Sequence, residues 1–191
     1  MRKHPKIPDY AECVFHWVRS EVYQWDQEMY DGSIARFERI RHLDGAFVIA
    51  TTKGQKIILT KQEQPLRPLF LSLPGWALEP DELPAVGAER ELLEETGYKP
   101  SKMIHWKTSD FGMSVLSFCD YFIAQDCEWI QDILPDSGEK IELTFVDFDE
   151  FLMLSENPLF QHKDIVSDLF LARIYPHKRE ELSNLLFGRE L

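Results

Sequence analysis

A helix between Pro84 and Gly97 is the feature that most restricts how this chain can fold. Proline suits the first turn of a helix, because no partner is needed there for the N–H group that it lacks, and glycine suits the residue after the last turn. Acidic side chains at Glu91, Glu94 and Glu95 are expected to lie away from the apolar stripe of this helix. That stripe, which we expect to pack against a sheet, consists of Ala85, Ala88, Leu92 and Leu93.

The three glutamates are crowded, because residues three or four apart on a helix are neighbours. Glu91 therefore lies beside both Glu94 and Glu95, and their like charges repel unless a cation lies among them. Mg²⁺ and Mn²⁺ prefer oxygen ligands and keep water molecules that substrate phosphates can replace. Arg90 can pair with a neighbouring carboxylate and fix its orientation. Acidic runs are also typical of solvated helix faces, so the cluster alone does not decide its role.

Segments rich in β-branched, aromatic or alternating residues lie on both sides of this helix and predict strands. Two further helices are expected near the end of the chain, at 164–175 and 179–187. Many strands with one central helix and late helices predict an α/β sandwich built on a mixed sheet. The expected strands lie within 13–30, 33–43, 46–52, 57–64, 69–71, 114–124 and 141–148.

Composition limits the partners of the chain. Its 191 residues are 44% hydrophobic, enough for the core of one domain, and its formal net charge is −12. An acidic surface repels phosphate backbones, so we expect no nucleic-acid partner, and an anionic substrate would need local help from metal ions. Three cysteines without a C-x-x-C pair indicate reduced thiols in the cytoplasm. The apolar runs are too short to cross a bilayer, so no membrane partner is expected.

A longer pattern surrounds the acidic cluster. Glu82 is followed by seven residues and then by Arg90, Glu91, Leu92, Leu93, Glu94, Glu95, Thr96, Gly97 and Tyr98. This series resembles the Nudix box, written G-x5-E-x7-R-E-U-x-E-E-x-G-U with U aliphatic or aromatic, and it matches every position from Glu82 onward. The resemblance implies a Nudix-type α/β/α sandwich with a mixed β-sheet. As a single domain, residues 1–191 would comprise an N-terminal antiparallel extension (1–43), a core (44–148) that holds the box (76–98), and C-terminal helices (149–191).

One box position departs from the pattern, because Trp76 stands where the box glycine is expected and Gly75 lies one residue earlier. In the family, the backbone carbonyl before the box glycine often takes part in metal binding, which implies Gly75 here. Three interpretations of Trp76 stay open: it stacks on the substrate, it packs over the loop, or it marks lost activity. The retained glutamates argue against the third.

Nudix enzymes typically hydrolyse a nucleoside diphosphate linked to another group. The resemblance therefore implies Glu91, Glu94 and Glu95 as ligands of Mg²⁺ or Mn²⁺, with Arg90 as their orienting residue and Glu82 supporting the loop. The general base would be Glu94, Glu95 or a carboxylate of a later acidic loop. In that loop Glu139 is the first candidate, with Asp136 and Glu142 behind it, and an exposed loop charge is the alternative for Glu139.

The residues before the core and the "QEQP…SLPG" region resemble the branch of ADP-ribose and nucleotide-sugar pyrophosphatases, although Gln64 replaces an arginine and Ser72 a glutamate. This branch implies a homodimer and a metal-dependent pyrophosphohydrolase acting on ADP-ribose or a related nucleoside diphosphate sugar. The alternatives are a hydrolase of an oxidised nucleoside triphosphate or a dinucleotide, and a non-catalytic binding module. Candidate substrate-binding residues are Trp76, Gln64, Arg67, Arg39 and Arg41.

Overall fold

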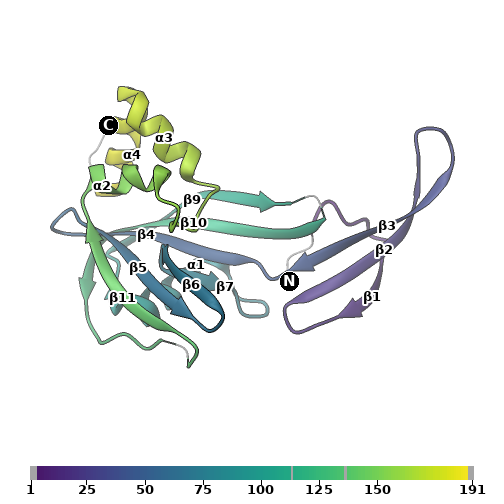
Figure 1. Ribbon diagram of the computed structural model, residues 1–191, viewed down its shortest axis with the longest axis horizontal. Helices are drawn as coiled ribbons and strands as arrows, with labels where there is room; N and C mark the ends of the chain where they lie inside the picture. Colours follow the sequence, from purple (N-terminus) through teal and green to yellow (C-terminus); the bar gives the residue numbers. More distant parts are fainter. Residues whose placement is uncertain (1–3, 113, 136, 189–191) are drawn as a thin grey trace.

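The computed structural model describes residues 4–112, 114–135 and 137–188. A mixed sheet forms its centre (Figure 1). The long strand β10 (Val115–Trp129) runs parallel to β4 (Gly45–Thr52) and antiparallel to β9 (Lys102–Phe111). Antiparallel pairing continues from β4 to β5 (Ile57–Gln64) and from β5 to β11 (Lys140–Val146). The mixed sheet predicted from the sequence is therefore confirmed.

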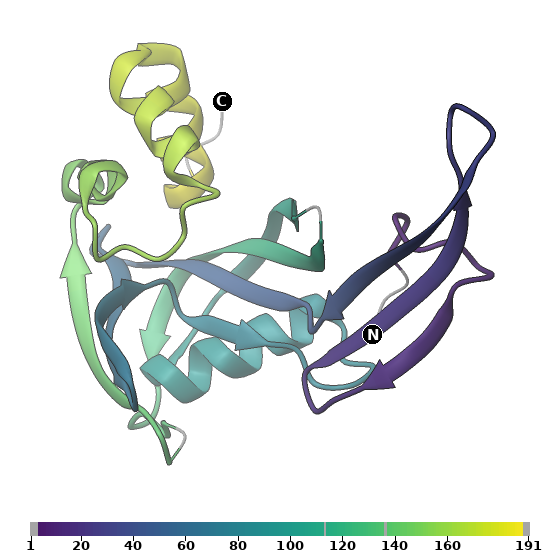
Figure 2. The same cartoon turned by 45° about the vertical axis from the view of Figure 1, so that its right-hand side comes forward.

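Helices cover both faces of this sheet (Figure 2). Helix α1 (Pro84–Thr96) lies under one face, and α2 (Phe148–Met153), α3 (Val166–Ile174) and α4 (Pro176–Phe187) lie over the other, with a 3₁₀ turn at Leu154–Glu156. Successive side chains of a strand point to opposite faces, so the central strands supply two apolar cores. The core under α1 includes Ala46, Val48, Ala50, Ile58, Ala88, Leu92, Phe122 and Ala124. The core under the late helices includes Ile49, Ile57, Leu59, Tyr121, Ile123, Phe151, Leu169 and Leu186. The α/β/α sandwich is confirmed.

An antiparallel extension precedes the core and projects to one side of it (Figure 1). It consists of β1 (Glu12–His16), β2 (Ser20–Glu28) and β3 (Ile34–His42). The end of β3 pairs in parallel with the start of β10, which joins the extension to the core sheet. Three shorter strands complete the chain: β6 (Arg67–Ser72), β7 (Gly75–Ala77) and β8 (Tyr98–Lys99).

Helix α1 begins and ends where its sequence predicts. Pro84 stands at its start, and Gly97 follows its last turn with φ +73° and donates its N–H to the carbonyl oxygen of Leu93. The expected burial was wrong at Ala85, which is exposed. The Glu95 side chain is buried, and it faces polar partners on β5 and β7.

Two further expectations need correction. Strand β6 is longer than the expected 69–71, and the last helix begins at Pro176 instead of 179. Among the described residues, no helix combines the length and the apolar character that a membrane crossing requires.

Candidate active site

The acidic candidates come together in one cavity of about 380 Å³. Glu91, Glu94 and Glu95 reach it from α1, and Glu139 reaches it from the loop before β11. The box and the late acidic loop, which the sequence analysis connected only by family resemblance, therefore share one space. The rest of the lining is Arg19, Leu43, Trp76, Ala77, Leu78, Glu79, Pro80, Arg90, Leu134 and Pro135.

Arg90 is the centre of the polar contacts in this cavity. Its Nε and Nη2 donate to the two carboxylate oxygens of Glu82 at 2.9 and 3.0 Å. Its Nη1 donates to Glu91 at 2.7 Å and to Glu94 at 3.0 Å. The hydrogen bonds with Arg90 lower the pKa of Glu82, and the bond to Glu82 raises the pKa of the guanidinium. Arg90 thus fixes three carboxylates and supports the loop that carries Glu82.

Glu95 is held in a different way, without an arginine. Its carboxylate accepts hydrogen bonds from the side-chain amide of Gln62, at 3.4 Å to each oxygen, and from the N–H of Gly75 at 3.2 Å. Burial raises the pKa of Glu95 well above its usual range, and the negative charge of Glu91 adds to the rise. A buried carboxyl beside further carboxylates is a position that favours a proton or a metal cation.

The donor set fits a hard divalent cation, because it consists of carboxylate oxygens facing one cavity. Burial also raises the pKa of Glu91, against the opposing hydrogen bond from Arg90. Within the part of the chain that the structure describes, no three His, Cys, Asp or Glu side chains converge closely enough to hold an ion in this conformation. Both Glu91 and Glu94 are engaged by Nη1 of Arg90, so a bound cation would compete with that atom.

In the loop before α1, Gly75 occupies a position where the backbone requires glycine. Its φ is +128°, and a Cβ atom there would lie 2.1 Å from the carbonyl oxygen of Ala46 and 2.8 Å from Cα of Phe47. Trp76 is the middle residue of β7, pairs with Ala46, and is not among the described non-glycine residues with positive φ. Tryptophan is therefore compatible with the backbone at the box position that it occupies.

Trp76 also borders a second cavity of about 240 Å³. Arg67 lines this cavity, stacks on Phe70 with its Cζ 3.8 Å from the ring centre, and donates to the Gln64 side chain at 3.3 Å. Gln64 in turn donates to Glu139 at 3.0 Å. A chain of polar contacts thus links the second cavity to the acidic one.

Of the two late-loop candidates that the structure describes, Glu139 lines the acidic cavity and Glu142 does not. Glu142 is exposed and pairs with Lys61 at 3.2 Å, and its side chain lines none of the described cavities. Asp136 lies outside the described residues.

Comparison with known proteins agrees with this geometry. The family model described as the NUDIX domain matches residues 41–169, more than half of the chain. The chain belongs to the Nudix family. It is 31% identical over 152 residues to an ADP-ribose pyrophosphatase of Bacillus subtilis (strain 168), covering 76% of this chain and 80% of that protein. This family membership makes the protein a Nudix hydrolase.

Two other relatives show how broad the similarity is. A methanol dehydrogenase activator of Bacillus methanolicus is 31% identical over 153 residues, covering 76% of this chain and 81% of that protein. A solved structure titled as an ADP compounds hydrolase superposes with a TM-score of 0.71 at 23% identity, covering 90% of this chain and 94% of that one. That similarity supports the Nudix fold.

Arg39 and Arg41, the two extension arginines expected to bind substrate, line neither of these two cavities of the Nudix domain. The expectation that Arg41 binds substrate was wrong for this conformation, because its side chain is 2% exposed and pairs with Asp44 at 2.6 Å. Arg39 lies over the rings of Trp25 and Phe37, at 5.9 and 5.7 Å from their centres. Its guanidinium contacts the extension itself.

Two residues of the site, Gln62 and Arg19, were not predicted from the sequence. Gln62, which contacts Glu95, lies two residues before Gln64 on β5. Side chains two residues apart on a strand point to the same face, so the candidate Gln64 could have indicated Gln62 as well. Arg19 lies between β1 and β2 and lines the acidic cavity. No motif or spacing in the sequence indicates Arg19.

Proposed function

We propose that this Nudix hydrolase cleaves the diphosphate of ADP-ribose or a related nucleoside diphosphate sugar, with Mg²⁺ or Mn²⁺ as cofactor. The observation that carries the proposal is the buried Glu95 carboxyl, which faces Glu91 and Glu139 in a cavity lined by carboxylates. The similarity to an ADP-ribose pyrophosphatase over most of both chains supports this choice of substrate.

The proposed roles follow from the contacts of each side chain. Glu91, Glu94 and Glu95, which line the acidic cavity, would hold the cations. The backbone carbonyl of Gly75, whose N–H donates to Glu95, is proposed to join them. Bound divalent cations supply positive charge to the diphosphate oxygens during attack by water. Arg90 orients Glu91 and Glu94 through its Nη1 atom.

Glu139 is the proposed general base. It lines the same cavity as the cation ligands, and Gln64 orients it by donating to its Oε1 atom. A carboxylate in this position can accept the proton that the attacking water loses. Trp76 is proposed to stack on the substrate, because it borders both cavities and is 39% exposed. Arg67 is proposed to offset substrate charge from the second cavity.

A substrate panel with product identification tests the function. Purified protein would be incubated with Mg²⁺ or Mn²⁺ and with ADP-ribose, nucleotide sugars, dinucleotides and oxidised nucleoside triphosphates. We expect AMP and ribose 5-phosphate from ADP-ribose, and no turnover after chelation of the metal. The absence of turnover with every member of the panel in either metal would contradict the proposal.

Hydrolysis of an oxidised nucleoside triphosphate is the second candidate. It is favoured by 44% identity over 57 residues to a putative 8-oxo-dGTP diphosphatase of Bacillus subtilis (strain 168). This match covers 30% of this chain and 36% of that protein, so it is confined to one region. Preference for the triphosphate over ADP-ribose in the same panel would decide for this candidate.

We also propose a homodimer formed through the extension, in the cytoplasm and without a nucleic-acid partner. Large apolar side chains are exposed there, including Val14, Phe15, Trp17, Val18 and Ile34. Three free cysteines and a net charge of −12 support the compartment and the exclusion of nucleic acid. Light scattering would give the mass, and a monomer at micromolar concentration would contradict the dimer. The organisation of residues 1–191 as one domain stays a prediction.

A further inference from the structure

The acidic cavity is lined by more carboxylates than the positive charges of its arginine side chains can offset. Glu79, Glu91, Glu94, Glu95 and Glu139 line it together with two arginines. One of these, Arg90, already donates to three carboxylates. A diphosphate that enters this cavity therefore meets repulsion unless other cations face it.

Arg19 is the second arginine of the cavity. It is exposed, and no described residue makes a hydrogen bond or an ion pair with its side chain. Its backbone is fixed, because its carbonyl oxygen accepts the N–H of Leu43 at 3.1 Å. An arginine fork with five donors and a fixed backbone is suited to bind phosphate oxygens.

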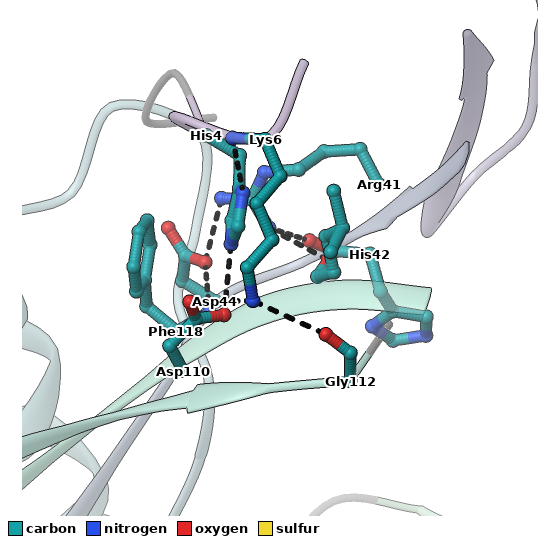
Figure 3. A network of polar contacts seen from close by, with 9 residues as sticks. His4, Lys6, Arg41, His42, Asp44, Asp110, Gly112 and Phe118 are labelled. Carbon is teal, nitrogen blue, oxygen red and sulfur yellow. Dashed lines mark hydrogen bonds and ion pairs between the residues drawn. The ribbon is translucent and has the colours of Figure 1, made fainter. Parts of the chain in front are cut away.

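A buried ion pair holds this part of the extension against the core (Figure 3). Arg41, at the end of β3, donates to Oδ1 of Asp44 at 2.6 Å, and both side chains are buried. The same oxygen accepts the N–H of Phe118 on β10 at 2.8 Å. The carbonyl oxygen of Asp44 accepts the N–H of Leu78 at 2.9 Å, in the wall of the acidic cavity.

The N-terminal segment covers this junction (Figure 3). His4 is buried, stacks on Phe118 with ring centres 4.7 Å apart, and contacts Asp110 at 2.9 Å. Lys6 pairs with the other oxygen of Asp110 at 2.8 Å. The Arg41–Asp44 pair is thus enclosed between the extension, β10 and the start of the chain.

We propose that Arg19 binds a phosphate group of the substrate at the acidic cavity, and that the Arg41–Asp44 pair is the positioning element that holds Arg19 opposite the carboxylates. The ligand is a diphosphate bound together with divalent cations. This choice of ligand rests on the proposed function. It assigns to the extension a direct role in binding substrate within the same chain.

Binding measurements test Arg19 separately from turnover. Calorimetry with Mg²⁺ would use ADP and inorganic pyrophosphate as probes for the wild type and for Arg19→Gln, Arg19→Lys and Arg36→Gln. Arg36 is a matched control, because it is an exposed arginine of the same extension that pairs with Asp26 and lines no described cavity.

We expect Arg19→Gln to raise the Kd of both probes about tenfold, which is about 1.4 kcal/mol, and Arg19→Lys to recover part of the loss. Arg36→Gln should leave both values unchanged. Unchanged binding in Arg19→Gln, an equal loss in Arg36→Gln, a loss confined to ADP, or a wild type that binds neither probe would each overturn the role of Arg19. If the wild type binds ADP but hydrolyses no ADP-ribose, the proposed function fails while Arg19 is still judged by binding.

The positioning role is tested by a double-mutant cycle. Arg41→Lys keeps the buried charge but loses the guanidinium fork, so the fold should survive, which circular dichroism would check. We expect this variant to weaken ADP binding and to add no further loss in the Arg19→Gln background. Losses that add in the double variant, or an Arg41→Lys variant that binds ADP like the wild type, would overturn the positioning role.

Discussion

Replacing Gly75 by alanine should destabilise the protein severely, because the backbone there accepts no Cβ atom. The φ of +128° is strained for any L-residue, and such strain costs about 1–3 kcal/mol. The added Cβ would meet the carbonyl oxygen of Ala46 at 2.1 Å, and a backbone atom cannot rotate away as a side chain can. Separation of β7 from β4 would then also remove the bond from the N–H of Gly75 to Glu95, worth about 1 kcal/mol.

Together these effects give a loss of about 2–4 kcal/mol in the free energy of unfolding. At about 2–4 °C per kcal/mol for a chain of this size, Tm should fall by roughly 10 °C. Thermal unfolding followed by circular dichroism would measure it. Gly54→Ala is the matched control. The φ of Gly54 lies outside the left-handed region, and a Cβ atom there would have its nearest neighbour, Oγ1 of Thr52, at 3.7 Å. A Tm for Gly75→Ala within about 2 °C of this control would refute the steric reasoning.

Further predictions concern the carboxylates and a buried histidine. Glu95→Gln keeps the volume and should fold, but kcat/KM should fall about 10²–10³-fold or more; near-normal activity in a steady-state assay would overturn the assignment. Glu139→Gln should lower kcat by a similar factor while Glu142→Gln, the matched control, has little effect, and equal rates in both would remove Glu139 as the base. Burial lowers the pKa of His162 to about 3, so its unfolded form binds a proton first as pH falls below about 6.5. Its contribution to stability is thus present near pH 7 and is lost on acidification, by about 1.4 kcal/mol per pH unit between pH 6 and 5. Urea unfolding at both values should show a smaller loss in His162→Gln, and parallel losses would contradict this account.

Local signals in the sequence predicted the helix that carries the box, because its ends depend on its own residues. Pro84 and Gly97 act through their backbones, and both stand where the structure begins and ends α1. The burial of Glu95 could not be predicted in this way. Its partner Gln62 lies 33 residues away, and the contact exists only once β5 packs beside α1. Helical spacing places a side chain on its own helix but does not identify what the sheet offers opposite it.

The position of Arg41 shows the same limit more strongly. Arg41 lies in the segment 33–43 that the sequence predicts as a strand, and an arginine is normally exposed to solvent. The partners that bury it are Asp44, at the turn into the core, and the carbonyl oxygen of Leu116, which is 75 residues away. A charge becomes buried when a distant strand supplies its counter-charge and acceptors, and neither periodicity nor composition carries that information.

The two departures from the pyrophosphatase branch pattern are consistent with each other in the structure. Where the branch has an arginine, Gln64 accepts a hydrogen bond from Arg67, so a guanidinium lies at this place although it comes from three residues later. Where the branch has a glutamate, the hydroxyl of Ser72 lies 2.9 Å from Nε2 of the buried His162. A carboxylate in that position would face an imidazole that burial keeps neutral, and so it would be left without a counter-charge. Ser72 and the neutral His162 thus replace the negative charge of the branch glutamate. Gln64 and Arg67 move the positive charge of the branch arginine three residues along the chain. The charges beside the second cavity therefore differ from the branch pattern, while Glu139 keeps Gln64 as its orienting partner.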